Sequence, residues 1–494
     1  MGQSLPHSTY TWPVETNDLP LFPAATTPPG PAPQAELVPG AKHEQKSARK
    51  ASKKTPAKPD TAPTPAPRAE LDAIIVGAGL AGLNCARELA AGGKRIVLLD
   101  AADAPGGRIR TDTVDGFRLD RGFQVLLTEY PEAKRVLDYD ALNLKTFLPG
   151  ALVRQGGSFH RFADPFREFR KAISFAFDSV VPFGDKLRIR RLRNDCLRQT
   201  DGDLFNQPEE TTREFLRRGG FSPMIQERFF APFFGGIFLE RNLTTSARWF
   251  RWLFRIFATG LAAVPALGME EIPRQLAASL APDIVRLNAP VTAMEKTPLG
   301  WRVTAGDAGS FEATQLVMAA REPEARTLLA TVRPAGPAPA RTWNRTTTFY
   351  YAATEAPVDE PVVVLNGDGP NSGPVNHLAV MSLVSPAYAP PGAHLICANV
   401  VGLAPETDPG MAALEADVRA QLRRWFGSQV NRWNVVGGYP IAHALPMQLS
   451  LQAARKAPTD SGIVLSGDYL TSASIQGALT SGARASAAVL ATEK

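Results

Sequence analysis

The chain has 494 residues, of which 44% are apolar and 21% charged, and carries a formal net charge of +6. This length can bury a core large enough for two domains. Its three scattered cysteines, Cys85, Cys196 and Cys397, form no CxxC pair and no even framework, which argues against disulfides and metal sites. The six histidines show no metal-ligand spacing either, so we expect no metal and a reducing, cytoplasmic location.

Residues 1–69 differ in composition from the rest of the chain. They are rich in proline, alanine and threonine, and Lys42–Lys58 is rich in lysine. Such a segment cannot bury enough apolar surface to offset its chain entropy, so we expect a disordered tail. It has no apolar run typical of a secretory signal. Its lysines suit anionic lipid or nucleic acid, but a solvated tail is the simpler interpretation, and we expect no nucleic-acid partner.

The first ordered elements predict a dinucleotide site. Ala73–Val76 is a short apolar run typical of a buried parallel strand, and it leads into a GxGxxG at Gly77, Gly79 and Gly82. The first glycine permits a tight turn, the second lets backbone approach a pyrophosphate, and the third lets the helix pack on the strand. The following helix, Leu80–Ala91, then points its N-terminal N–H groups at the phosphate.

A second strand and an acidic residue complete this unit. Ile96–Leu99 is apolar, and Asp100 follows it, eighteen residues beyond Gly82. A carboxylate there holds a ribose hydroxyl and repels a 2′-phosphate. A lone GxGxxG is weak, because glycine turns between strands and helices are common, but strand, helix, strand and acid in register together predict a dinucleotide.

Three further blocks identify a family resemblance. They are the GG-R-x-x-T of Gly106, Gly107, Arg108 and Thr111, the D-x-G of Asp120 and Gly122, and a C-terminal block of Gly467, Asp468, Ser474–Ala478, Ser481 and Gly482. With these blocks in this order, the chain resembles the flavin-dependent amine oxidase superfamily, which includes monoamine oxidases, protoporphyrinogen oxidase and phytoene desaturases. The middle of the chain matches loosely, apart from Ala231–Gly236, which is similar to a motif of protoporphyrinogen oxidases.

The resemblance implies an α/β fold with a Rossmann-type FAD-binding domain interleaved with a substrate domain of mixed sheet and helices. We place the FAD-binding domain at residues 70–128, 281–330 and 455–494, and the substrate domain at 129–280 and 331–454.

The implied cofactor is FAD, bound without a covalent link. By resemblance, Asp468 bonds the ribityl chain or pyrophosphate, backbone near Ile475 and Gln476 meets the ring, and the backbone of Val291 meets adenine. Arg108 can neutralise pyrophosphate or lie beside the flavin. A helix beginning near Gln476 would aim its positive end at the reduced flavin. The complete expected site is Gly77, Ala78, Gly79, Ala81, Gly82, Asp100, Ala101, Gly107, Arg108, Gly122, Phe123, Val291, Gly467, Asp468, Ile475 and Gln476.

Elements between these blocks are less well defined. Residues 130–280 read as mostly helical, with short helices at Pro131–Leu137 and Thr211–Arg218. Strands expected on the FAD side are Ile284–Leu287, Val291–Glu295, Trp301–Thr304 and Phe311–Ala320; those on the substrate side are Thr346–Ala352, Val362–Leu365, His377–Leu383 and His394–Val401. Ala412–Phe426 is an amphipathic helix that ends at Gly427.

One helical segment, Thr245–Gly260, mixes aromatic and basic residues. Trp249, Trp252 and Phe257 fall at helical spacing, and Arg248, Arg251 and Arg255 gather on another face. This composition suits peripheral contact with a membrane, and Phe162–Phe177 repeats it more weakly. A core helix with snorkelling arginines and a substrate tunnel remain open as alternatives. No run is long enough to span a bilayer.

Departures from the amine oxidases bear on the substrate. No cysteine follows Cys397, so a covalent flavin link in the C-terminal block is excluded, and Thr346–Tyr351 lacks the lysine that those oxidases place near the flavin. Tyr469 is the only nearby candidate for an aromatic cage, and no general base stands out. We therefore expect hydride transfer between flavin N5 and a carbon of a polyene, isoprenoid or tetrapyrrole-like substrate. An amine oxidase and a non-catalytic prenyl-binding escort on the same fold are the alternatives.

Overall fold

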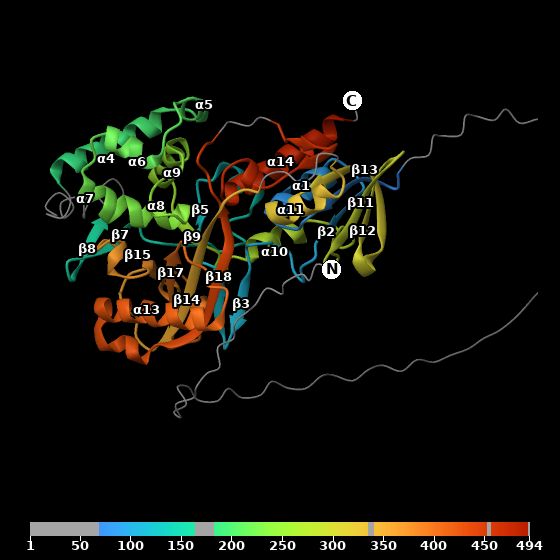
Figure 1. Ribbon diagram of the computed structural model, residues 1–494. Coiled ribbons are helices and arrows are strands. Elements are labelled where there is room, and N and C mark those ends of the chain that lie inside the picture. The colour runs from blue at the N-terminus through green and yellow to red at the C-terminus, as the bar shows by residue number, and fades with distance from the viewer. Residues whose placement is uncertain (1–68, 164–181, 334–339, 452–455, 493–494) are drawn as a thin grey trace, which may run out of the picture. The chain divides into compact units, whose positions relative to one another are not determined.

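The computed structural model describes residues 69–163, 182–333, 340–451 and 456–492 (Figure 1). Two large sheets with flanking helices confirm the expected α/β fold class. The predictions for the N-terminal tail and for most of Phe162–Phe177 lie outside the described residues.

The first sheet is the dinucleotide-type sheet. Its strand order is β10-β2-β1-β13-β12-β11, with β20 also paired to β13 and β19 to β20. Strands β10, β2, β1, β13 and β20 run parallel to one another. Strands β1 and β2 are almost entirely buried because both faces of the sheet are covered there. The bounds are β1 Leu71–Val76, β2 Ile96–Leu99, β10 Val285–Arg286, β11 Val291–Thr297, β12 Gly300–Ala305, β13 Ser310–Met318, β19 Thr459–Asp460 and β20 Ile463–Leu465.

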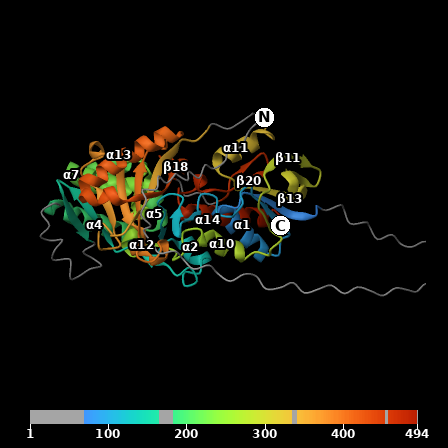
Figure 2. The same cartoon turned by 90° about the horizontal axis from the view of Figure 1, so that it is seen from below.

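Two helices from opposite ends of the chain pack side by side on this sheet (Figures 1 and 2). They are α1, Leu80–Ala91, and α14, Ile475–Ala491. A Cβ on Gly482 would lie 2.3 Å from the Ala81 carbonyl oxygen, so only glycine permits this approach. The buried side chain of Asn84 donates to the Leu479 carbonyl at 2.7 Å. Helices α10, Glu271–Ala278, and α11, Glu322–Ala330, complete this part.

The second sheet has the order β18-β14-β17-β16-β15-β7-β8. Alternate residues of its central strands belong to different cores: Leu378 and Val380 pack with helix α13, Asp408–Phe426, whereas Ala379 lies in the core on the other face, with α8, Ala231–Phe238. The bounds are β7 Gly150–Gln155, β8 Ser158–Ala163, β14 Trp343–Ala353, β15 Val363–Asn366, β16 Val375–Val380, β17 His394–Val401 and β18 Asn434–Pro446.

The remaining helices and strands lie outside the two large sheets. The helices are α2 Pro131–Val136, α4 Phe183–Arg198, α5 Asp201–Phe205, α6 Thr212–Arg218, α7 Pro223–Ile225, α9 Ala247–Thr259 and α12 Met381–Val384. The strands are β3 Thr111–Val114, β4 Phe117–Asp120, β5 Leu126–Leu127, β6 Lys145–Thr146 and β9 Ala262–Val264. One π-helix, η1, spans Gln226–Phe230, and 3₁₀ turns occupy η2 Gly306–Ala308, η3 Pro370–Ser372, η4 Pro386–Tyr388, η5 Gly427–Arg432 and η6 Asp468–Leu470.

The expectation that residues 130–280 are mostly helical is wrong for its first part. Strands β7 and β8 form a hairpin there, and β7 pairs in parallel with β15, about two hundred residues further along the chain. This pairing is non-local, and short apolar runs do not reveal their partner strand.

The predicted strand His377–Leu383 is also too long. Strand β16 ends at Val380 and the chain turns into α12. The Ser382 hydroxyl there accepts a hydrogen bond from the Leu395 N–H at 3.1 Å, which ties this turn to β17. A hydroxyl that bonds neighbouring backbone favours a turn over a continuing strand.

We expect Gly482→Ala to destabilise the protein by roughly 1–3 kcal/mol, because the added methyl must push α14 away from the backbone of α1. Gly202→Ala is a matched control: it adds the same methyl inside α5, where the nearest atom would lie 3.7 Å away. Thermal unfolding of both variants checks this. Equal melting temperatures for the two variants would contradict the packing argument.

Candidate functional site

The turn before α1 forms an open cradle. Gly77 has a φ of +108°, and a Cβ on Gly82 would lie 1.9 Å from the Gly77 carbonyl oxygen, so both positions require glycine. A Cβ on Gly79, in contrast, would meet nothing within 4 Å. Gly79 is also the N-cap of α1. Because glycine has no side chain, it gives no capping hydrogen bond to the first turn of the helix, which contains Ala81. Open space thus lies beside Gly79 at the N-terminus of α1, where a pyrophosphate binds in dinucleotide-binding folds.

Asp100 lies at the carboxyl end of β2, beside this cradle. Its Oδ2 accepts the Ala78 N–H at 2.5 Å and its Oδ1 accepts the Ala102 N–H at 2.8 Å, on either side of Ala101. The carboxylate is therefore fixed at the sheet edge where ribose binds in such folds. The Ala289 N–H donates to the Asp100 carbonyl at 2.8 Å, which brings the chain just before Val291 to the same edge.

The second glycine pair lies against the first. The Gly106 N–H donates to the Ala78 carbonyl at 2.8 Å, and Gly79 forms an isolated bridge with Gly106. A Cβ on Gly107, whose φ is +60°, would lie 3.4 Å from the Gly79 Cα. The two glycine motifs predicted from separate stretches therefore border one space.

Arg108 and Asp468 join the first and last predicted blocks. The guanidinium donates to Asp468 Oδ1 at 2.6 Å and to the Ala444 carbonyl at 2.8 Å, and it lies 5.5 Å from the ring centre of Trp343. The Asp468 side chain is only 5% exposed, whereas the Arg108 side chain is 30% exposed, so the ion pair is shielded from solvent on its acidic side. Gly467 begins this turn with a φ of +154°.

The N-terminus of α14 completes the site. The Ser474 hydroxyl caps the helix by accepting the Gly477 N–H at 3.0 Å. The Gln476 side chain is already engaged: its Oε1 accepts the Glu132 N–H at 2.9 Å, which docks α2 on α14. The Gln476 side chain is therefore committed to this contact, and cofactor binding by the backbone of Ile475 and Gln476 stays a prediction.

These features fit FAD. Two helix N-termini suit a pyrophosphate and an electron-rich ring, Asp100 suits a ribose, and the backbone at Gly79 borders open space. The direct cofactor contacts of each residue remain predictions.

The buried carboxylate of Asp120, which the sequence marked only as part of the D-x-G motif, organises the next block. Asp120 Oδ1 accepts from the Thr111 hydroxyl at 2.6 Å and the Met269 N–H at 2.9 Å, and its Oδ2 accepts from the Tyr388 hydroxyl at 2.8 Å. The Tyr350 hydroxyl of β14 donates to the Asp120 carbonyl at 2.8 Å. Burial raises the pKa of Asp120 to about 6, although its three hydrogen bonds oppose the rise.

Beyond Gly122, Phe123 leads to a polar pair that the sequence did not single out. The Phe123 ring packs edge-on against His377, with ring centres 4.7 Å apart. Asn376 Nδ2 and His377 Nδ1 lie 3.0 Å apart at a bulge in β16, while His377 Nε2 and Asn376 Oδ1 have no partner. Burial, helped by the charge of Arg241, lowers the pKa of His377 to about 3, so the ring is neutral at physiological pH. No sequence pattern marks this bulge.

The aromatic-basic helix α9 is a core helix, which corrects the prediction of membrane contact through its tryptophans. Trp249 and Trp252 are buried and stack on each other at 5.0 Å. The arginines bind protein groups: Arg248 donates to the Gln207 carbonyl at 2.7 Å, Arg251 to Gln199 Oε1 at 2.6 Å, and Arg255 to Asp201. Phe257 packs edge-on against Phe233. The core-helix alternative thus describes the aromatic face of α9, but its arginines bind protein groups and do not extend into water.

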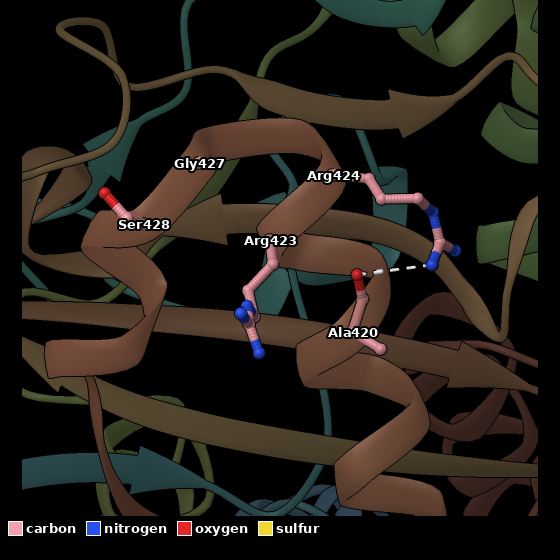
Figure 3. A pocket seen from close by; sticks show the side chains of 5 residues that line it. All are labelled: Ala420, Arg423, Arg424, Gly427 and Ser428. Carbon is pink, nitrogen blue, oxygen red and sulfur yellow. Dashed lines mark hydrogen bonds between the residues drawn. The ribbon is translucent and has the colours of Figure 1, made fainter.

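A surface hollow of about 410 Å³ lies at the C-terminal end of α13 (Figure 3). It is lined by Ala420, Arg423, Arg424, Gly427 and Ser428. The Arg424 guanidinium donates to the Ala420 carbonyl of its own helix and to the Ser372 carbonyl of η3, so it is engaged by backbone groups of the protein. None of the predicted cofactor residues borders this hollow.

Other predicted absences concern metals, disulfides and membrane spans. The three cysteines are unpaired and buried. In the described ranges, no group of three or more histidine, cysteine or acidic side chains could hold a metal ion. Within those same ranges, no helix is both long and apolar enough to cross a bilayer.

Comparison with known proteins agrees with this geometry. The profile of the flavin-containing amine oxidoreductase family matches residues 80–490. The putrescine oxidase of Kocuria rosea is 41% identical over 78 residues, which are 16% of each chain. The 15-cis-phytoene desaturase of Narcissus pseudonarcissus is 32% identical over 108 residues, which are 21% of this chain and 19% of that protein. Both alignments thus span only about a fifth or less of the relative.

The fold has close structural counterparts. The crystal structure of an oxidoreductase from Methanosarcina mazei superposes with a TM-score of 0.65 at 16% identity, covering 86% of this chain and all of that one. The chain therefore belongs to the flavin-containing amine oxidoreductase family.

We expect Gly79→Ala to weaken FAD binding by about tenfold or more, a loss of about 1.4 kcal/mol, while leaving the stability of the apoprotein unchanged. The methyl would enter the space that backbone leaves for the pyrophosphate but would touch no protein atom. Titration of apoprotein with FAD measures the first quantity, and thermal unfolding of apoprotein the second. An unaltered affinity for FAD would contradict the prediction that the pyrophosphate lies beside Gly79.

The raised pKa of Asp120 predicts a pH-dependent term in stability. Because the folded state holds the proton more tightly than the unfolded chain, this contribution is complete below about pH 4 and is lost as the pH rises through 6. Relative to Asp120→Asn, the parent should lose roughly 3 kcal/mol between pH 4 and pH 7. Denaturant titrations of both proteins across this range measure the difference.

Asp112→Asn is the control with the opposite sign. Burial alone would raise the pKa of Asp112, but hydrogen bonds from Arg121 and Tyr439 hold it below its usual value. The parent should therefore lose stability relative to Asp112→Asn as the pH falls below 4. A flat profile for Asp120→Asn relative to the parent would show that Asp120 is not the titrating group.

Proposed function

We propose that the protein transfers hydride between the N5 atom of a non-covalently bound FAD and a carbon of an apolar, polyene, isoprenoid or tetrapyrrole-like substrate. The observation that carries the substrate class is a phenylalanine cluster on the substrate side. Phe229 stacks on Phe162 at 3.9 Å and on Phe233 at 5.4 Å, and all three rings stay partly exposed within the fold. Large apolar rings left partly exposed beside a core suit an apolar ligand.

The polar groups beside this cluster favour the same substrate class. Strand β14 has threonine, phenylalanine and tyrosine at Thr346–Tyr351 and no lysine. Tyr350 is bound to the Asp120 carbonyl, and His377 stays neutral because of its low pKa. These groups offer no charge to orient an ammonium ion and no strong base.

Protein residues supply binding and orientation to this reaction. The α1 N-terminus and Gly79 would hold the pyrophosphate, Asp100 the ribose, and the Arg108–Asp468 pair the middle of the cofactor. The backbone of Ile475 and Gln476 would place the positive end of α14 at the ring, where it favours an anionic reduced flavin. Bound FAD supplies the hydride chemistry itself. Cys397 is buried in β17, well before the C-terminal block, which supports a non-covalent link.

An amine oxidase is the second candidate, because the local likeness to putrescine oxidase favours it. The two functions differ in their products under air. An amine oxidase releases hydrogen peroxide when a monoamine or polyamine is added, whereas the proposed enzyme would release none.

The visible absorption spectrum of freshly purified protein tests the proposal first. We expect oxidised-flavin absorption that is released as free FAD on denaturation, followed by anaerobic bleaching with an apolar substrate and none with amines. Flavin that stays attached after denaturation would contradict non-covalent binding. Bleaching by amines alone would replace the proposal by the amine oxidase, and a colourless protein that cannot be reconstituted would favour the non-catalytic escort.

A further inference from the structure

Helix α4 exposes apolar side chains to an unusual degree. Among the described residues, six large hydrophobic side chains are strongly exposed, and three of them lie on α4: Phe183 at 72%, Leu187 at 42% and Leu197 at 36%. The other three, Leu267, Leu403 and Leu449, are scattered. A concentrated apolar surface on one element marks an interaction site more strongly than single exposed residues do.

These side chains share one face of the helix. Positions 183, 187, 190, 194 and 197 are spaced by four and three residues, which places them along one stripe. The opposite face is the buried one, with Asp185, Leu192 and Cys196. The exposed stripe therefore points away from the core that α4 shares with α9.

The stripe is framed by positive charge. The basic residues of α4 are Lys186, Arg188, Arg190, Arg191, Arg193 and Arg198, against the acidic Asp185 and Asp195. Arg190, Arg191 and Arg198 are exposed. Asp185 is buried and binds the Ser222 hydroxyl and Arg188, so it does not neutralise the outer face.

Acidic groups on the next element are also engaged within the fold. Asp201 of α5 pairs with Arg255, and Asp203 accepts from the Thr200 N–H at 2.9 Å as part of a capping box. The outer face of α4 thus keeps an excess of positive charge around an apolar centre.

We propose that this face of α4 docks on an anionic lipid bilayer. Phe183, Leu187 and Leu197 enter the boundary between headgroups and acyl chains, and the arginines meet lipid phosphates. A second copy of the chain fits less well, because two such faces would bring their arginines together. This surface is distinct from α9, whose arginines and tryptophans are used inside the fold, and it does not depend on the proposed reaction.

Cosedimentation of the full-length holoprotein with vesicles tests the proposal. Vesicles of phosphatidylcholine with phosphatidylglycerol should bind the protein, binding should fall at high salt, and pure phosphatidylcholine should bind it weakly. Phe183→Ser/Leu187→Ser and Arg190→Gln/Arg191→Gln should each weaken binding about tenfold. Matched controls are Leu403→Ser/Leu449→Ser and Arg423→Gln/Arg432→Gln, which remove two exposed apolar or two exposed basic side chains elsewhere and should stay within about twofold of the parent.

All these variants keep the lysine-rich tail, so binding through that tail would leave them equal to the parent, and this result would overturn the proposal. Failure of the parent to bind anionic vesicles would overturn it too, as would a concentration-dependent dimer that the α4 variants abolish. The flavin spectrum and melting temperature of each variant report whether it is folded.

A spin label gives a readout that does not need a disruptive variant. The native cysteines are all buried, so Leu187→Cys can be labelled selectively, with Leu403→Cys as the control. On anionic vesicles the label at 187 should become accessible to oxygen and shielded from a water-soluble relaxing agent, and the label at 403 should not. Equal accessibility at both sites would contradict docking through α4.

Discussion

Helix α14 can lie against α1 only because Gly482 has no side chain, and the cofactor site depends on that contact. A Cβ there would lie 2.3 Å from the Ala81 carbonyl oxygen, within the first turn of the helix whose N-terminus faces the cradle. The close approach brings α14, the last helix along the chain, against α1. Asp468 then reaches Arg108, across 360 residues of sequence, and the N-terminus of α14 comes to the same region as the cradle.

A second constraint ties the segment around Asp120 to the second sheet. Asp120 receives hydrogen bonds from β3, from the start of α10 and from Tyr388, and its carbonyl receives the Tyr350 hydroxyl of β14. A buried carboxylate is stable only when its oxygens are satisfied, so each of these elements is held in position by the others. Phe123 follows Asp120 by three residues, and its ring packs edge-on against His377 of the second sheet.

The sequence was sufficient to predict the parts of the fold that local physics determines. Helix α1 and strands β2 and β17 were predicted with their observed bounds, because glycine turns and apolar runs mark them. The structure confirms the steric need for Gly77 and Gly82, whereas cofactor binding by Gly79 and Asp100 stays a prediction. The β7–β15 pairing, the β16 bulge and the Asp120 network could not be predicted, because each depends on partners distant in sequence.

The two arginine-rich helices show why composition alone misplaces an interface. In α9, Ser246 caps the helix and arginines bind carbonyls of the segments around it, so a sequence that resembles an interfacial helix is instead surrounded by protein. In α4, the stripe holds fewer large apolar side chains and the mean hydropathy of the helix is lower, which made it inconspicuous in the sequence. What distinguishes them is whether a neighbouring element satisfies the arginines and covers the rings. That property belongs to tertiary packing, and a periodic pattern of aromatic and basic residues cannot specify it.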